Sequence, residues 1–195
     1  MSKIIIGLVG PMASGKDVVK KYLEEKHNAK SCKFSTIIRD VLDRLGVEKS
    51  RENMVNMSTS LRILFGEDLL ARVIAKDSLE HDAPIVVIDG VRRNSDIVNL
   101  MGLPNFFLIS IDADPEVRFK RMVLRNENKG DAEKTFEHFM ADHKLETETQ
   151  IPEVMSEAKF KIDNTEDTFP VLYAKIEKVF EEIKAESAAQ HITIE

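Results

Sequence analysis

The residues with the clearest chemical meaning lie near the start of the chain, where two glycines and a lysine follow the spacing G-x-x-x-x-G-K. The segment consists of Gly10, Pro11, Met12, Ala13, Ser14, Gly15 and Lys16. This spacing is typical of a phosphate-binding loop, because glycines allow successive backbone N–H groups to turn towards phosphate oxygens. A helix that begins near Gly15 would add the positive end of its dipole, and Lys16 would add a mobile positive charge. We expect the segment to hold the phosphates of a nucleotide; the alternative is a glycine-containing turn followed by an unrelated lysine.

The residue after this lysine departs from the usual pattern. A Ser or Thr hydroxyl normally follows the lysine and binds Mg²⁺, and here the residue is Asp17. A second carboxylate, Asp89, follows the apolar run at residues 85–88, where it could hold Mg²⁺ through water or orient a nucleophile. Alone, Asp89 could also be a turn or cap residue. We expect Asp17 and Asp89 to share a magnesium ion and its water shell.

Several arginines could meet the remaining demand for positive charge. Phosphoryl transfer depends mainly on positioning and on neutralisation of charge. Arg39 and Arg92 are candidates for holding the phosphate of an acceptor, and Arg121 and Arg125 for holding the phosphate that is transferred. Each arginine alone could instead be a solvated surface residue. With these assignments, the candidate catalytic residues are Lys16, Asp89, Arg121 and Arg125.

Composition narrows the classes of protein that fit this site. The chain has 195 residues, 43% of them hydrophobic and 32% charged, which is typical of a single folded domain. A net charge of −6 argues against nucleic acid as a partner. The single cysteine, Cys32, excludes an internal disulfide, and no apolar run approaches the length of a membrane span. We expect a cytoplasmic protein with no membrane partner, either a monomer or a homodimer.

The elements that must position these residues alternate between strands and helices. Apolar or alternating runs predict five strands, at residues 4–9, 28–34, 85–88, 106–111 and 160–163. Between them, Ser35 or Thr36, Ser50 and Asp114 with Pro115 are expected to begin helices. Further helices are expected at 17–26, 69–81, 95–101, 135–148 and 168–185, with Pro152 as a breaker. The end of the chain, residues 186–195, has weak periodicity and is expected to be disordered or to add an edge contact.

This alternation predicts an α/β fold in which a parallel sheet carries helices on both faces. Ligands of such sheets bind beyond the carboxyl ends of the strands. The phosphate-loop segment, residues 35–39, residues 89–93, residues 112–114 and Asn164 all follow predicted strands. We therefore expect them to meet at one edge of the sheet.

Taken together, these segments resemble the nucleoside monophosphate kinases, the P-loop group that contains adenylate kinase and dephospho-CoA kinase. The matching segments are residues 10–16, 34–39, 88–92, 118–125 and 163–165. The resemblance implies a three-layer P-loop fold with sheet order 2-3-1-4-5, an acceptor-binding helical insert at about 36–80 and a lid at about 118–135. It also implies ATP with Mg²⁺ as the donor, bound by residues 10–17, with Asn164 against the adenine, and an acceptor held by Ser35, Arg39 and Arg92.

The predicted function is ATP-dependent phosphoryl transfer to a nucleoside monophosphate or a similar small phosphorylated acceptor. Two alternatives stay open. One is transfer to a hydroxyl, as in dephospho-CoA kinase, although Phe34, Ser35 and Thr36 stand where that family has an acidic sequence. The other is a switch that binds ATP without efficient transfer, because the hydroxyl after Lys16 is missing.

Overall fold

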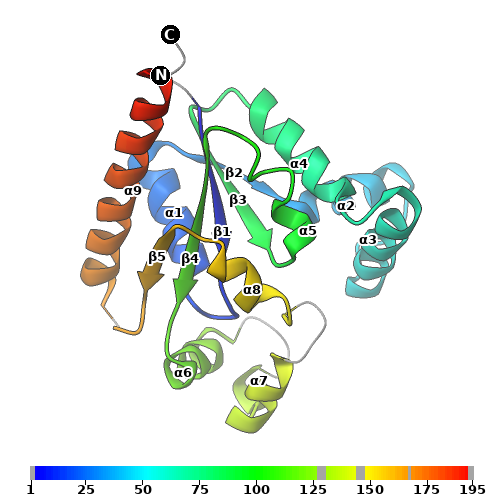
Figure 1. The fold of residues 1–195 in the computed structure, drawn as a ribbon. Coiled ribbons are helices and arrows are strands. Elements are labelled where there is room, and N and C mark those ends of the chain that lie inside the picture. Colours follow the sequence, from blue (N-terminus) through cyan, green and yellow to red (C-terminus); the bar gives the residue numbers. More distant parts are fainter. Residues whose placement is uncertain (1–2, 127–130, 144–147, 167, 193–195) are drawn as a thin grey trace.

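A five-stranded parallel sheet forms the centre of the computed structural model, which describes residues 3–126, 131–143, 148–166 and 168–192. The strand order is β2-β3-β1-β4-β5, and every neighbouring pair is parallel (Figure 1). The strands are β1 (Ile4–Val9), β2 (Lys30–Lys33), β3 (Ile85–Val91), β4 (Phe106–Asp112) and β5 (Phe160–Asp163). The predicted fold class and sheet order are confirmed.

The central strand β1 separates two hydrophobic cores. All six of its residues are buried, and successive side chains point to opposite faces of the sheet. Ile4, Ile6 and Leu8 pack in the core that includes side chains of α1 (Lys16–His27) and α9 (Phe169–Ile192). Ile5 and Val9 pack in the opposite core, against side chains of four helices: α2 (Phe34–Arg44), α4 (Leu69–Glu80), α5 (Asn94–Ile97) and α8 (Ile151–Ser156). Helices therefore cover both faces of the sheet, as the apolar strands require (Figure 1).

The connection from β2 to β3 carries three helices beside the sheet: α2 (Phe34–Arg44), α3 (Arg51–Phe65) and α4 (Leu69–Glu80). Ser50 caps α3 as predicted, because its Oγ accepts a hydrogen bond from Asn53 N at 3.2 Å. The expected cap of α2 at Ser35 or Thr36 is wrong. Helix α2 begins at Phe34, directly after the last residue of β2. The side chain of Phe34 is only 8% exposed, and its burial in the core fixes the start of the helix at this residue.

The second half of the chain adds shorter elements around β4 and β5. They are α5 (Asn94–Ile97), α6 (Pro115–Arg125), a 3-10 turn (Asp131–Glu133), α7 (Phe136–Asp142) and α8 (Ile151–Ser156). Asp114 caps α6 as predicted, since its Oδ1 accepts from Glu116 N at 2.8 Å. The predicted helix 135–148 ends at Asp142, and Pro152 lies in the first turn of α8 instead of only breaking a helix. The predicted lid at 118–135 includes residues 127–130, which lie outside the described residues.

Helix α9 is longer than its sequence pattern indicated. It continues to Ile192, and Ser187 is 3% exposed, so the expectation of disorder is wrong for residues 186–192. Residues 193–195 lie outside the described part of the chain. Among the helices of the described residues, none combines the length and the apolar character that a membrane span requires.

Candidate functional site

The phosphate-loop segment connects β1 to α1 at the carboxyl edge of the sheet. Gly15 has a φ of +105°, and a Cβ at this position would come within 2.3 Å of Asn164 Nδ2. A Cβ at Gly10 would lie 2.0 Å from the carbonyl oxygen of Ile111. Both positions therefore require glycine, because a side chain would collide with these neighbouring atoms. Gly15 also has a backbone conformation that other residues rarely adopt. The expectation that glycines shape this turn agrees with this geometry.

Asn164, which follows β5, is hydrogen-bonded to the phosphate-loop segment. Its side chain is buried, and Nδ2 donates a hydrogen bond to the carbonyl oxygen of Ser14 at 2.8 Å. Its backbone N–H donates to the carbonyl oxygen of Asp112 at 2.7 Å. The hydroxyl of Ser14 is itself buried and has no hydrogen-bond partner among the described residues. A buried polar atom of this kind inside a glycine-lined turn fits a loop that is completed by an anionic ligand.

Lys16 lies across the same loop. Its Nζ donates to the carbonyl oxygens of Gly10 at 2.6 Å and Pro11 at 2.9 Å. Burial, together with the positive charge of Arg92, lowers the pKa of Lys16 to about 8. Lys16 is therefore a cation whose charge would be favoured by phosphate oxygens placed against the loop.

The two carboxylates predicted to hold a metal converge on one point, and the ammonium group of Lys20 lies there. Lys20 Nζ is 2.9 Å from Asp17 Oδ1 and 2.9 Å from Asp89 Oδ2. Burial favours a higher pKa for Asp17, but its hydrogen bond to Lys20 and the charges of Lys20 and Lys16 outweigh burial and lower this pKa. Burial likewise opposes the charge of Lys20, but the hydrogen bonds to Asp89 and Asp17 raise its pKa above the ordinary value.

These carboxylates fit a magnesium ion that keeps part of its water shell. Among the described residues, no group of three or more His, Cys, Asp or Glu side chains could hold a metal. A site formed by Asp17, Asp89, water and nucleotide phosphates is the kind that Mg²⁺ commonly occupies. The donor set is therefore suitable for Mg²⁺ only together with a bound nucleotide.

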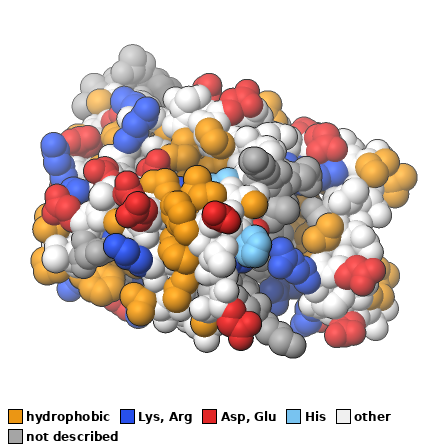
Figure 2. All heavy atoms as spheres, turned by 90° about the horizontal axis from the view of Figure 1, so that it is seen from below, with side chains coloured by type: hydrophobic (Ala, Val, Ile, Leu, Met, Phe, Trp, Pro, Cys, Tyr) orange, Lys and Arg blue, Asp and Glu red, His pale blue; other side chains and the backbone are white. Residues whose placement is uncertain are grey.

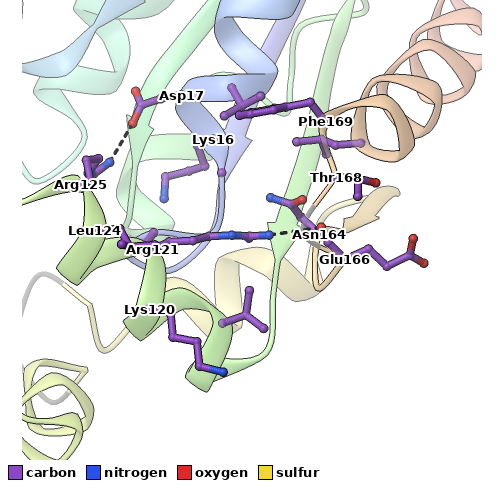
Figure 3. Close-up of a pocket in the computed structure, with 15 residues that line it drawn as sticks. Lys16, Asp17, Lys120, Arg121, Leu124, Arg125, Asn164, Glu166, Thr168 and Phe169 are labelled. Carbon is purple, nitrogen blue, oxygen red and sulfur yellow. Dashed lines mark hydrogen bonds and ion pairs between the residues drawn. The ribbon is translucent and has the colours of Figure 1, made fainter.

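A first cavity of about 610 Å³ opens beside the loop, between α6 and the start of α9 (Figure 3). It is lined by five residues to which the sequence analysis gives roles at a nucleotide site: Lys16, Asp17, Arg121, Arg125 and Asn164. The guanidinium Nη1 of Arg125 lies 3.6 Å from Asp17 Oδ2, and Arg121 Nη2 donates to the carbonyl oxygen of Glu166 at 3.3 Å.

Apolar side chains form the outer part of the first cavity. Leu124 on α6 is 85% exposed and Phe169 at the start of α9 is 61% exposed, although both line the cavity. Large apolar side chains with this exposure next to a polar loop form a surface on which a flat ring system can stack.

A second cavity of about 460 Å³ lies between α2, α3 and the end of β3, and Asp89 is one of its lining residues. Ser35 and Arg92, which the sequence analysis assigns to the acceptor, line it. Arg39 is exposed on α2 and is not one of the described residues that line this cavity. The other polar and charged residues that line the second cavity are Lys33, Arg51, Ser58, Thr59, Arg62, Arg93 and Asp96. Seen from below, where the strands end, Lys and Arg side chains gather beside a hollowed part of the surface (Figure 2).

A buried ion pair fixes the wall of the second cavity. Arg62 Nη2 lies 2.8 Å from Asp96 Oδ1, and both side chains are almost fully buried. Asp96 Oδ2 accepts hydrogen bonds from the backbone N–H groups of Arg92 and Arg93, each at 3.0 Å. The guanidinium of Arg92 also pairs with Glu148 at 2.5 Å. Arg62 and Asp96 therefore hold the backbone from which the side chains of Arg92 and Arg93 project.

Arg118 reaches the phosphate loop from α6. Its side chain is buried, with Nε donating to the carbonyl oxygen of Ala113 at 2.9 Å and Nη1 to that of Met12 at 3.4 Å. Nη1 also lies 2.7 Å from His143 Nε2. Arg118 therefore links the loop to residues near α7 and does not line either cavity described above.

Sequence reasoning assigned no role to Lys20 or Asp96, and it favours Arg62 only as a minor candidate within the acceptor-binding insert. The spacing of Asp17 and Lys20 on one helix, three residues apart, is a signal for their pairing. The contacts of Lys20 with Asp89, and of Arg62 with Asp96, join residues distant in sequence and have no local signal.

The fold and the loop geometry define a P-loop protein, and comparison with known proteins agrees. Residues 6–146 match the family described as AAA domain (AAA_18). A UPF0200 protein of Pyrococcus horikoshii is 30% identical over 185 residues, which cover 92% of this chain and 97% of that protein. A UPF0200 protein of Saccharolobus islandicus is 26% identical over 163 residues, or 82% of this chain and 84% of that protein. The chain belongs to this AAA domain family and to the UPF0200 family.

Solved structures of small-molecule kinases share the fold. A shikimate kinase from Bacteroides thetaiotaomicron superposes with a TM-score of 0.62 at 16% identity, covering 93% of this chain and 98% of that one. A gluconokinase from Sinorhizobium meliloti 1021 gives 0.57 at 12% identity and covers 97% of both chains. At these identities the likeness concerns the fold alone, which is that of P-loop kinases.

Proposed function

We propose that this protein transfers the terminal phosphoryl group of ATP to a nucleoside monophosphate or a similar small phosphorylated acceptor. One observation carries the proposal: the first cavity reaches Asp17, the second reaches Asp89, and a single side chain, Lys20, contacts both carboxylates. Two cavities that meet at a pair of carboxylates beside a phosphate loop suit a reaction between two bound substrates.

In this proposal ATP occupies the first cavity. Its phosphates lie against residues 10–17. The buried hydroxyl of Ser14, which has no hydrogen-bond partner among the described residues, and the ammonium group of Lys16 support anion binding there. Its adenine lies between the exposed apolar side chains of Leu124 and Phe169. The amide of Asn164 is already bonded to the loop, so its role in ATP binding is to hold the loop as well as to border the adenine.

The acceptor occupies the second cavity. Its phosphate pairs with the guanidinium groups of Arg92 and Arg93, whose backbone is held by Asp96. The apolar lining residues Phe34, Ile38, Met54, Val55 and Leu70 suit the ring system of a nucleoside. The predicted contact of Arg39 requires its exposed side chain to move from α2 towards this cavity.

The transfer step needs little covalent help from the protein. An oxygen of the acceptor phosphate attacks the terminal phosphorus of ATP, the bond from that phosphorus to its bridging oxygen breaks, and ADP leaves with the electron pair. A phosphate oxygen is already ionised at neutral pH, so no proton has to be removed. Lys16, Arg121 and Arg125 line the donor cavity and neutralise the negative charge that develops. Magnesium held by Asp17 and Asp89 would supply further charge neutralisation on the phosphates.

The test is a transfer assay with ATP labelled on its terminal phosphate, offered a panel of ribo- and deoxynucleoside monophosphates and dephospho-CoA. We expect label in the diphosphate of at least one nucleotide, and we expect its loss in Lys16→Met. Lys21→Met is the matched control, because Lys21 lies on the same helix in an exposed pair with Glu25. Label in dephospho-CoA alone would support transfer to a hydroxyl, and tight ATP binding without transfer would support a switch; either result contradicts the proposal.

A further inference from the structure

Lys20 holds a position that no sequence argument assigned to it. Its ammonium group lies 2.9 Å from a carboxylate oxygen of Asp17 and 2.9 Å from one of Asp89, and its side chain is only 12% exposed. The two oxygens can therefore be no further apart than twice that distance. Asp17 lies one helical turn before Lys20 on α1, and Asp89 lies near the end of β3, so two elements aim opposite charges at one point.

Three other cations act on these carboxylates. The charge of Lys16 acts on both, although no described ion pair joins it to either. Two more cations lie near one carboxylate, at longer distances than Lys20. Arg125 Nη1 is 3.6 Å from Asp17 Oδ2, and Lys33 Nζ is 3.7 Å from Asp89 Oδ2. Both contacts are longer than those of Lys20, which pairs with the two carboxylates at 2.9 Å each. Lys20 therefore pairs directly with both carboxylates and opposes their mutual repulsion at the shortest distances.

A divalent ion that used both carboxylates would need the space that the ammonium group fills. The ion and the ammonium repel each other, and each requires the same oxygens, either directly or through water. Lysine has a flexible four-carbon stem, so its charged group can leave this position without a change in the helix.

We propose that Lys20 is the protein's own counter-ion at the metal position: it holds Asp17 and Asp89 together in the absence of metal, and a divalent cation must displace it. Lys20 thereby lowers the affinity of the empty site for metal and makes metal binding depend on the added charge of nucleotide phosphates. This inference rests on the proposed function only in that the same two carboxylates serve the metal.

The consequence is a gain of metal affinity when the charge of Lys20 is removed. In Lys20→Met an apolar stem is retained but the two carboxylates lose the cation that bridges them, which favours a divalent cation. Lys20→Gln removes the charge and keeps a hydrogen-bond donor, which provides a second variant if the methionine variant does not fold. Lys20→Arg keeps the charge and is expected to retain the competition. Lys21→Met removes one charge from an exposed position of the same helix and serves as the control.

The experiment measures Mn²⁺ binding to the protein without nucleotide, by the electron paramagnetic resonance signal of free Mn²⁺. We expect Lys20→Met and Lys20→Gln to bind Mn²⁺ at least about tenfold more tightly than the wild type. We expect the affinities of Lys20→Arg and Lys21→Met to stay within about twofold of the wild-type value. Adding Asp17→Asn to Lys20→Met should remove the gain, because it removes one of the two carboxylates.

Unchanged or weaker Mn²⁺ binding in both uncharged variants would overturn the proposal, and so would an equal gain in Lys21→Met. The result is independent of the transfer assay. A protein that phosphorylates no acceptor but shows the Mn²⁺ shift refutes the proposed function and supports the role of Lys20. A protein that transfers phosphate but shows no Mn²⁺ shift supports the proposed function and refutes the role of Lys20.

Discussion

The lowered pKa of Lys16 predicts that ATP binding takes up a proton at alkaline pH. Burial and the charge of Arg92 lower this pKa to about 8, so Lys16 is about 90% charged at pH 7 and about 10% charged at pH 9. Phosphate oxygens against the loop favour the charged form and raise the pKa of the bound state. Binding should therefore take up about 0.9 proton at pH 9 and about 0.1 at pH 7, if the pKa in the complex lies well above 9.

The same shift sets the pH dependence of affinity. Charged Lys16 is the form that binds phosphate, so the affinity for ATP is greatest below pH 8 and falls as the pH rises above it. Between pH 7 and pH 9 the fall should be about tenfold, or about 1.4 kcal/mol. Titration calorimetry in two buffers with different ionisation enthalpies measures both the affinity and the proton uptake.

Two variants separate Lys16 from other titrating groups. Lys16→Met should bind ATP weakly at both pH values and should show no uptake near one proton at pH 9. Lys21→Met, altered at an exposed position of α1, should behave as the wild type. Proton uptake near zero in the wild type at pH 9, or the same uptake in Lys16→Met, would refute the reasoning.

Two further predictions concern residues that support the site. Asn164→Ala removes the hydrogen bond to the carbonyl oxygen of Ser14 and should lower the free energy of unfolding by about 1–2 kcal/mol, measured by urea denaturation, and weaken ATP binding; full retention of both would contradict the role of Asn164. Arg62→Met leaves the buried Asp96 without its cation and should lower the free energy of unfolding by about 3–5 kcal/mol. The exposed pair of Arg72 with Asp68 is the comparison, and Arg72→Met should cost under about 1 kcal/mol; similar losses for the two variants would show that burial of the pair has no effect.

The fold class could be predicted from local sequence patterns, and the structure confirms it. Alternation of apolar strands with helical patterns predicts a parallel sheet, and the G-x-x-x-x-G-K spacing marks the first crossover. The caps at Ser50 and Asp114 were predictable because a cap is a local hydrogen bond between residues two or three apart. The order of the strands, by contrast, came from the family resemblance and not from spacing.

Local patterns failed where distant contacts decide the structure. Helix α2 begins at Phe34 because this ring enters the core with residues such as Ile88 and Leu70, which are far away in sequence. Pro152 is compatible with either the end of one helix or the first turn of the next, and the chain uses the second.

At the candidate site, residue types were easier to predict than side-chain directions. Asp17 and Asp89 lie at the cavities because they are placed near the carboxyl ends of strands β1 and β3. Arg121 and Arg125 lie at the first cavity because both are on α6, which borders it. The bridge from Lys20 to Asp89 spans 69 residues of sequence, so no local spacing could indicate it.

The central claim is that the two cavities are the two halves of one transfer site. Dinucleoside pentaphosphates, with adenosine at one end and each common nucleoside at the other, test it most directly, because one molecule must occupy both halves. In equilibrium titrations we expect one such compound to bind with a stoichiometry of one and at least about tenfold more tightly than ATP. We also expect this gain to be lost in Arg93→Ala, because Arg93 lines the second cavity and not the first. If no member of the series binds more tightly than ATP, the two cavities do not form a common site and the account is wrong.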